Sequence, residues 1–240
     1  MKLSFSIRGW SGHTWEDFVE VAEEMRMRGI ELHCAHGEPF SEKGGPFHRH
    51  NAAATRRQMF EKGLTLNCIN TVCDIADEGK MAESLEELSR CTEMAKNLGV
   101  SYIRIHTMQK GEAATSAAHK FIEAALPVAE ASDVTLILET IGAFSETGVL
   151  RDVLNTYASD HLAALWDLHS TYREGGETAE LTIQNLGAYV RHVHIKDSVM
   201  EDNDARFCLL GEGNLPFNEF IDALASINYD EFISFEWNPA

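Results

Sequence analysis

Four residues with acidic or imidazole side chains each end a short apolar run in the second half of the chain. Glu139 ends LILE, Asp167 ends ALWD, His194 ends HVH and Glu236 ends ISFE. Runs of this length and composition are typical of buried strands, and successive members of the set are about one strand–helix unit or somewhat more apart. If the strands are parallel neighbours, all four side chains converge at one end of the sheet.

Together these side chains have the composition of a divalent metal site. Taken singly, each has a simpler explanation, because a polar residue at a strand end commonly caps the next helix or joins an ion pair. That explanation weakens for the set, since neighbouring buried carboxylates are costly unless a cation or protons neutralise them. Three carboxylates with one imidazole favour Mn²⁺ or Mg²⁺, with Co²⁺ and Zn²⁺ as alternatives.

The segments that position these residues alternate between strand and helix patterns along the whole chain. Apolar runs predict eight strands, at residues 3–7, 29–33, 64–70, 102–107, 135–140, 162–167, 190–197 and 232–237. Amphipathic patterns predict helices at about 14–28, 51–62, 81–98, 113–131, 146–158, 179–186 and 218–227. Thr14 with Asp17 predicts a capped helix start, and Gly99 predicts a left-handed helix end.

This alternation predicts parallel strands joined by right-handed crossovers. Eight such units match a closed (β/α)8 TIM barrel, which is typically about 250 residues long. An open doubly wound sheet is the alternative, and it is weaker because neither its glycine-rich dinucleotide motif nor a phosphate-binding P-loop is present. We expect residues 1–240 to form one TIM-barrel domain.

Five motifs carry a resemblance to the xylose-isomerase-like TIM barrel superfamily. They are LET at 138–140, WDLH at 166–169, HVHIKD at 192–197, LGEG at 210–213 and ISFEW at 233–237. The superfamily includes sugar phosphate isomerases and epimerases, ketose 3-epimerases, inosose dehydratases, hydroxypyruvate isomerases and class II AP endonucleases. The resemblance covers nearly the whole chain and implies that Glu139, Asp167, His194 and Glu236 are metal ligands. It also implies that Glu139 and Glu236 act as the acid/base pair.

One position departs from the superfamily pattern. Many members carry Asp-x-x-His at the sixth strand, whereas here Ser170 follows Asp167 by three places and His169 comes one place early. His169 is therefore a candidate substitute for substrate binding. The change also counts against an AP endonuclease, as does the absence of an Asp-x-His motif at Asp197.

Three further side chains are candidates for binding substrate. Strand alternation places Lys196 on the same face as His194, closer to the mouth, and places His106 near the mouth of the fourth strand. Arg206 follows the seventh strand in an expected loop and could bind a phosphate or hydroxyl group. The alternatives are an ion pair with a neighbouring carboxylate for Lys196 and a solvated loop charge for Arg206.

The predicted activity is that of a metal-dependent isomerase or epimerase. The substrate is a small polyhydroxy carbonyl compound, a sugar or sugar phosphate, and the proton next to its carbonyl moves through an enediolate. The alternatives are an inosose-type dehydratase of the same superfamily and a non-catalytic sugar- or metal-binding barrel.

Composition excludes several other classes of protein. Lys and Arg number 20 against 38 Asp and Glu, so the formal net charge is -18 and no nucleic acid partner is expected. No apolar run is long enough to span a membrane. The first residues lack the apolar stretch of a secretory signal, which predicts a cytoplasmic protein, and the five cysteines include no C-x-x-C pair.

Two segments at the periphery carry expectations of their own. The glycine-containing segment 36–50 is a candidate lid over the mouth. The chain stops at Ala240, shortly after Glu236, so no helix is expected after the eighth strand. The exposed apolar groove beside strands one and eight is then expected to be covered by a second copy, in a homo-oligomer, or by a further domain.

Overall fold

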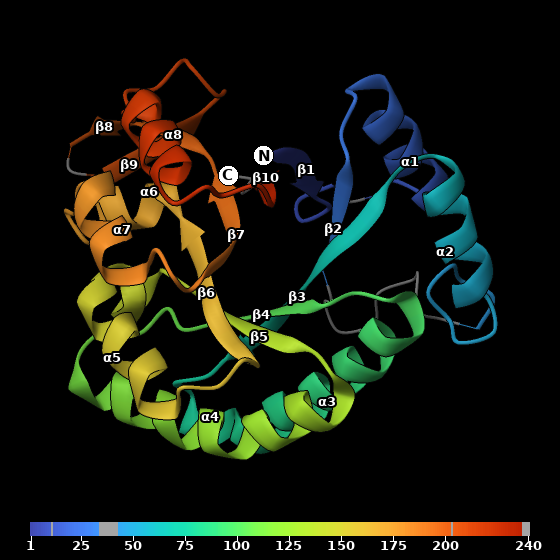
Figure 1. Ribbon diagram of the computed structural model, residues 1–240, viewed down its shortest axis with the longest axis horizontal. Coiled ribbons are helices and arrows are strands. Elements are labelled where there is room, and N and C mark those ends of the chain that lie inside the picture. Colours follow the sequence, from blue (N-terminus) through green and yellow to red (C-terminus); the bar gives the residue numbers. More distant parts are fainter. Residues whose placement is uncertain (11, 34–42, 203, 237–240) are drawn as a thin grey trace.

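Eight parallel strands close into a barrel in the computed structural model, which describes residues 1–10, 12–33, 43–202 and 204–236. The strands are β1 (Lys2–Ser6), β2 (Gly29–His33), β3 (Thr65–Asp74), β4 (Tyr102–His106), β5 (Thr135–Glu139), β6 (Leu162–Asp167), β7 (Val190–Ile195) and β10 (Phe232–Phe235). Their order around the barrel is β1-β10-β7-β6-β5-β4-β3-β2. The predicted closed barrel is confirmed, and the open sheet is excluded (Figure 1).

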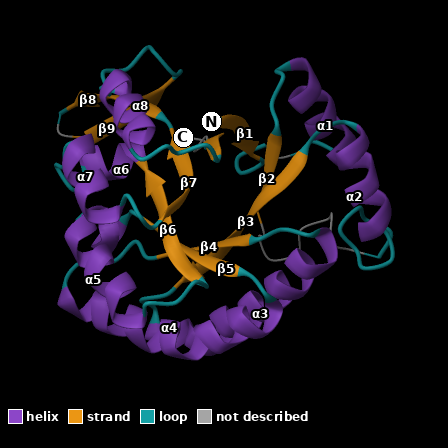
Figure 2. Ribbon diagram, in the orientation of Figure 1, coloured by secondary structure: helices purple, strands orange, loops and turns teal. Residues whose placement is uncertain are grey.

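Helices lie outside the strands and cover most of the barrel (Figure 2). They are α1 (Trp15–Glu24), α2 (Ala52–Glu61), α3 (Met81–Leu98), α4 (Glu112–Ser132), α5 (Thr147–Tyr157), α6 (Leu168–Arg173), α7 (Ala179–Leu186) and α8 (Phe217–Ser226), with short 3₁₀ turns η2 (Glu78–Lys80) and η3 (Gly142–Ser145). Each predicted helix overlaps one of these, and the short α6 was not predicted. Thr14 and Asp17 form the predicted capping box, and Gly99 ends α3 with φ 73°.

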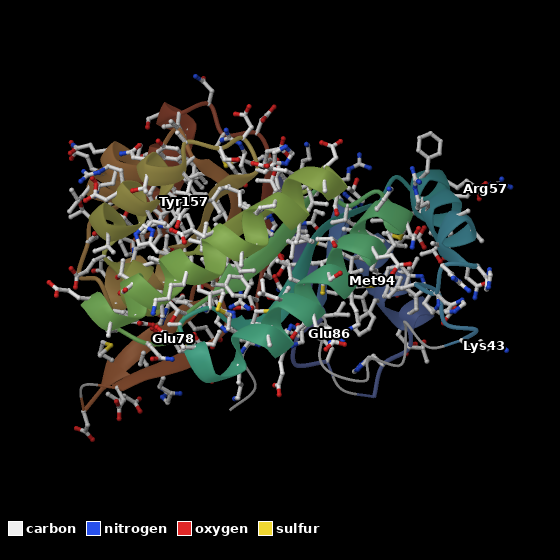
Figure 3. All side chains as sticks on the ribbon, turned by 90° about the horizontal axis from the view of Figure 1, so that it is seen from below. Lys43, Arg57, Glu78, Glu86, Met94 and Tyr157 are labelled. Atoms are coloured by element: carbon white, nitrogen blue, oxygen red, sulfur yellow. The ribbon has the colours of Figure 1, made fainter. Side chains whose placement is uncertain are left out.

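The outer faces of the helices carry much of the charge. Arg57 on α2 and Glu86 on α3 project from the ring of helices in the view from below (Figure 3). Glu86 accepts a hydrogen bond from Arg90, one turn further along the same helix. The apolar faces of the same helices pack on the strands, where Met59 and Leu88 are buried.

The interior of the barrel changes from apolar to polar along its axis. A small apolar cluster fills it near the middle of the strands, formed by Cys68, Ile137, Ala163 and Leu165. The inward positions two residues further along β5 and β6 are Glu139 and Asp167. Polar side chains therefore occupy the barrel interior at the C-terminal ends of the strands, and the apolar cluster packs directly beneath them.

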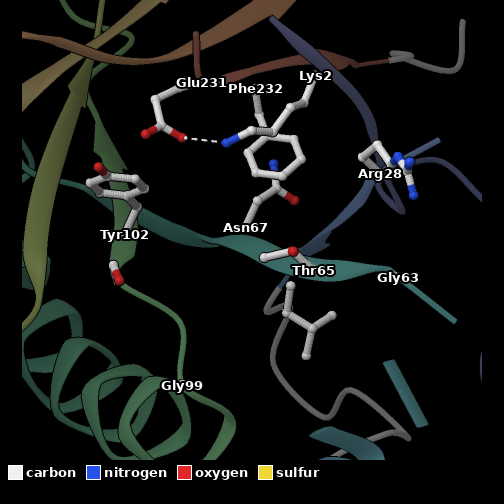
Figure 4. Close-up of a pocket in the computed structure, with 11 residues that line it drawn as sticks. Lys2, Arg28, Gly63, Thr65, Asn67, Gly99, Tyr102, Glu231 and Phe232 are labelled. Carbon is white, nitrogen blue, oxygen red and sulfur yellow. Dashed lines mark ion pairs between the residues drawn. The ribbon is translucent and has the colours of Figure 1, made fainter. Parts of the chain in front are cut away.

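The opposite end of the barrel holds a separate cavity of about 530 Å³ (Figure 4). Lys2, Thr65, Tyr102 and Phe232, which begin four of the strands, line it. Lys2 pairs there with Glu231 at 3.5 Å, between side chains that are both about half exposed. This cavity lies at the N-terminal ends of the strands, away from the predicted site.

An antiparallel hairpin interrupts the predicted segment after β7. It consists of β8 (Asp197–Glu201) and β9 (Asp204–Cys208), and Val199 pairs with Arg206. The predicted seventh strand ran through 197 as one element, whereas β7 ends at Ile195 and Asp197 begins the hairpin. Arg206, expected in a loop, lies in a strand of this hairpin.

An apolar groove lies beside β1 and β10, as predicted. It forms a hollow of about 620 Å³. Phe5, Phe235 and residues in and just after α1 bound it on one side, and residues 208–210 bound it on the other. Met25, Leu209 and Leu210 remain 62%, 62% and 45% exposed. The wall opposite α1 therefore includes the end of the hairpin, which was not expected, and the cover over the groove stays a prediction.

Two other expectations concern the candidate lid and membrane-spanning segments. Residues 36–42 of the candidate lid lie outside the described part of the chain, while Asn51 donates a hydrogen bond to the Gly45 carbonyl in the part that follows. Among the helices that the structure describes, none is long and apolar enough to cross a membrane.

Candidate metal centre

The four predicted side chains meet at the C-terminal mouth of the barrel. Glu139 ends β5, Asp167 ends β6, His194 lies near the end of β7 and Glu236 directly follows β10. All four are buried, and one ligand atom from each lies within 4.8 Å of the others. Because β5, β6, β7 and β10 are consecutive around the barrel, the closure of the sheet brings these ends together.

The two nitrogens of His194 face opposite directions. Nδ1 lies 2.9 Å from Glu139 Oε1 and 3.7 Å from Glu236 Oε2. Nε2 lies 3.0 and 3.2 Å from the two carboxylate oxygens of Glu31. If Nε2–H keeps donating to Glu31 when the Nδ1 proton is lost, Nδ1 becomes an electron-pair donor that faces the cluster, the orientation a metal-ligating histidine needs.

Asp167 presents one oxygen to the chain and the other to the cluster. Oδ1 accepts a hydrogen bond of 2.7 Å from the Ser170 backbone N–H and so caps α6. Oδ2 is buried and accepts no hydrogen bond of regular geometry from the described residues, although the Lys196 ammonium lies 2.6 Å away. An oxygen of this kind beside other donors fits a divalent cation, so the residues present fit the expected metal.

Glu31, at the centre of β2, is a part of the site whose contacts with the histidines were not predicted from the sequence. It is fully buried, and its Oε2 lies 2.6 Å from His192 Nε2, while Asn70 donates to its Oε1. Burial by itself raises the pKa of Glu31, but His194 and His192 outweigh it and hold that pKa well below its usual range. Glu31 is therefore an anion that orients both imidazoles.

Buried or partly buried cations compensate the carboxylates. Arg104 donates from Nε to Glu139 Oε2 at 2.7 Å and also from its Nη2, and both side chains are almost fully buried. Arg8, 37% exposed, donates to Glu236 Oε1 at 3.1 Å. Lys196 completes the set, and its contacts include Glu236 Oε2 at 3.3 Å.

These partners set the protonation of the cluster. Burial raises the pKa of each carboxyl group, but Arg104 and His194 lower the pKa of Glu139 well below its usual range. His194 and Lys196 likewise lower the pKa of Glu236 to about 2. Burial opposes protonation of His194, yet Glu31 and Glu236 raise its pKa well above the usual range. Both glutamates are therefore anionic at neutral pH.

Two neutral imidazoles lie beside this cluster. His106, at the end of β4, has a buried Nδ1 without a hydrogen-bond partner in the described structure. Burial and, to a smaller extent, the positive charge of Arg104 lower its pKa to about 3. His33, at the end of β2, also has an unpartnered buried Nδ1, and burial followed by Arg8 lowers its pKa to about 4. His106 was a predicted substrate-binding residue, whereas strand alternation placed His33 on the same face of its strand as Glu31 without giving it that role.

The remaining two predicted substrate residues have contacts with the β8–β9 hairpin. His169 is buried against the hairpin, with Nε2 3.0 Å from Ser198 Oγ and its ring 5.0 Å from that of Phe207. Arg206 is 62% exposed and pairs with Glu201 across the hairpin at 2.8 Å. The structure therefore does not bring Arg206 to the cluster, because the alternation of β9 directs it to a surface partner.

Asp197 explains why the HVHIKD and LGEG motifs occur together. Its Oδ2 accepts hydrogen bonds of 2.9 Å from the backbone N–H groups of Gly211 and Gly213. A Cβ on Gly213 would lie 2.0 Å from Asp197 Oδ1, so only glycine permits this approach. The carboxylate ties the returning chain to the base of the hairpin, directly after Lys196.

A closed barrel with this cluster at its C-terminal mouth defines the class of the protein. The family model for xylose isomerase-like TIM barrels matches residues 19–240. The chain therefore belongs to the xylose isomerase-like TIM barrels, as the five motifs implied. A search of curated proteins finds no match.

Solved structures with the same fold cover nearly the whole chain. The IOLI protein, determined with a bound zinc atom, has a TM-score of 0.80 at 18% identity, over 98% of this chain and 88% of that one. The probable 3-DHS dehydratase AsbF from Bacillus anthracis has a TM-score of 0.78 at 20% identity, over 99% and 93%. The 3-keto-D-glucoside 4-epimerase YcjR from E. coli has a TM-score of 0.77 at 15% identity, over 100% and 93%.

Proposed function

We propose that this protein is a divalent-metal-dependent isomerase or epimerase that acts on a small sugar or sugar phosphate. The observation that carries the proposal is the buried cluster of Glu139, Asp167, His194 and Glu236 at the mouth of the barrel. Similar solved structures support it, since one is a 3-keto-D-glucoside 4-epimerase and another holds a zinc atom. Membership in the family makes an enzyme the best-supported class.

The four cluster residues would hold the metal, and Mn²⁺ is the ion we propose for a set rich in carboxylate oxygens. A bound divalent ion supplies a positive charge beside substrate oxygens, where negative charge develops as a proton leaves the neighbouring carbon. Glu31 would fix the orientation of His194 through Nε2. Its effect on the ion would be exerted through that imidazole.

Glu139 and Glu236 are the proposed proton carriers. They come from different strands, and separate guanidinium groups, those of Arg104 and Arg8, hold their outer oxygens. Each keeps a second oxygen toward the cluster, where it could take or return a proton at a substrate carbon. His106 and His33 remain neutral at pH 7 and are the proposed hydrogen-bonding partners of substrate hydroxyl groups.

A dehydratase is the second candidate, favoured by the similarity to the probable dehydratase AsbF. Both reactions begin with removal of a proton next to a carbonyl. They differ in whether the proton returns or a hydroxide leaves. The same cluster could begin either reaction.

A panel of ketoses, ketose phosphates and inososes, incubated with the protein and Mn²⁺ in ²H₂O, tests this proposal. We expect at least one compound to gain deuterium at a carbon next to its carbonyl and to yield an epimer or isomer by NMR. A chelator should stop the exchange, and fresh Mn²⁺ should restore it. Loss of water from the product would select the dehydratase, whereas no exchange with any compound would favour a non-catalytic barrel.

Replacing Asp167 by Asn should weaken Mn²⁺ binding at least about 10-fold, because an amide oxygen is a poorer ligand for a divalent cation than a carboxylate. The amide oxygen can still accept the Ser170 hydrogen bond, so the start of α6 should persist. Isothermal titration calorimetry measures the affinity, with Asp152→Asn on the surface of α5 as the matched control. Equal Mn²⁺ affinity in all three proteins would exclude Asp167 from the metal site.

A further inference from the structure

We propose that the Lys196 ammonium competes with the divalent ion for Asp167 and Glu236, and that it leaves these carboxylates when the ion binds. Lys196 would thereby stabilise the metal-free protein and lower its affinity for metal. The inference rests on the metal site of the proposed function. It assigns to Lys196 a role different from the substrate contact expected from the sequence.

The position of Lys196 is the first observation. It directly follows β7, and only 8% of its surface is exposed. Strands β6 and β10 flank β7 on its two sides, so Lys196 lies between Asp167 and Glu236. Nζ is 2.6 Å from Asp167 Oδ2 and 3.3 Å from Glu236 Oε2.

These contacts use the oxygens that the ion needs. Asp167 Oδ2 is the oxygen not used in capping α6, and Glu236 Oε2 is the one that faces His194 Nδ1. A Mn²⁺ or Mg²⁺ ion binds oxygen at about 2.0–2.2 Å. An ion within that distance of both oxygens would lie in close contact with the ammonium, and the two cations would repel each other.

The balance of buried charge leads to the same conclusion. Four buried carboxylates, those of Glu31, Glu139, Asp167 and Glu236, face three buried cations, namely Arg104, Lys196 and the protonated His194, with Arg8 reaching in from the edge. Without an ion, Lys196 is the main compensation for Asp167. A divalent ion supplies that compensation itself, so the ammonium becomes surplus.

The structure also provides space for the displaced side chain. Lys196 and Glu236 border the hollow of about 620 Å³ whose walls include Trp10 and Ile195. A lysine can lay its methylene groups against such apolar walls while its ammonium reaches water. Displacement therefore requires a change of side-chain rotamer and leaves the barrel strands in place.

Mn²⁺ titration of the metal-free Lys196→Met protein tests the proposal. Methionine has a similar length and no charge, so we expect Mn²⁺ to bind at least about 10-fold more tightly than to the unmodified protein, with a larger Mn²⁺-induced rise in melting temperature. Without metal, the variant should melt at a lower temperature. Lys62→Met is the matched control, because Lys62 pairs with Glu23 at the surface. It should leave Mn²⁺ affinity unchanged.

The other outcomes overturn the proposal in distinguishable ways. Equal or weaker Mn²⁺ binding by Lys196→Met would show that Lys196 does not compete, while the metal site itself would stand. No Mn²⁺ binding by any of these proteins would remove both the metal site and the competition. Lys196→Gln, which keeps a polar group beside the carboxylates, carries the same comparison if the Met variant does not fold without metal.

Discussion

Replacing Glu236 by Gln should slow the exchange of substrate hydrogen with solvent by about 10²–10⁴-fold, the usual contribution of a general base. The amide cannot accept the proton, although it can still accept the hydrogen bond from Arg8. The same change at Glu139 should have a similar effect, because epimerisation needs a group that removes the proton and another that returns it. Deuterium incorporation at saturating Mn²⁺, followed by NMR, measures the rate.

Glu231→Gln is the matched control for this experiment. Glu231 directly precedes β10, and its side chain pairs with Lys2 at the opposite end of the barrel. We expect no change in the exchange rate from this variant. Calorimetry on each variant separates loss of the proton carrier from loss of metal. Wild-type exchange by metal-loaded Glu236→Gln would exclude the two-carboxylate scheme.

The sequence was sufficient to predict the barrel and its polar mouth because both depend on local patterns. Glu139 and Asp167 each end an apolar run whose length defines a strand, and parallel strands place their C-terminal ends on one side. The alternation within HVHIKD likewise predicted that His194 and Lys196 share a face. These predictions needed no knowledge of which residues lie opposite each other.

The partners across the barrel could not be predicted in this way. Glu31 lies against His194 only because the barrel closes, and the two residues are far apart in sequence. Arg8 lies in the segment between β1 and α1, and nothing in its neighbourhood indicates Glu236 as its partner. A charged residue inside a short apolar strand, as at Glu31, was the available signal, since such a residue needs a buried partner.

The hairpin was missed for a different reason. Residues 197–208 mix polar and apolar side chains without a clear buried face, and their sequence contains no standard two-residue turn such as Asn-Gly or Asp-Gly. Backbone hydrogen bonds from Gly211 and Gly213 to Asp197 fix the end of this segment. Arg206 was predicted to lie in a loop and to contact the substrate because these two strands were not recognised.

Replacing Arg104 by Met should destabilise the metal-free protein by about 3–5 kcal/mol, the usual cost of removing one partner from a buried ion pair. Glu139 would then keep its charge in a buried position with only His194 as a direct hydrogen-bond partner among the described residues. For a chain of this size the melting temperature should fall by roughly 6–20 °C. Urea unfolding monitored by circular dichroism measures the free energy.

Two further variants separate the buried charge from lost packing. Arg90→Met removes a pair with Glu86 that is exposed on α3, and it should change the unfolding free energy by less than about 1 kcal/mol. The double variant Arg104→Met, Glu139→Gln should recover much of the lost stability, because the uncompensated carboxylate is gone. If the double variant were as unstable as the sum of both single changes, the loss would come from packing of the arginine side chain. Arg104 would then be a part of the barrel interior whose charge does not control Glu139.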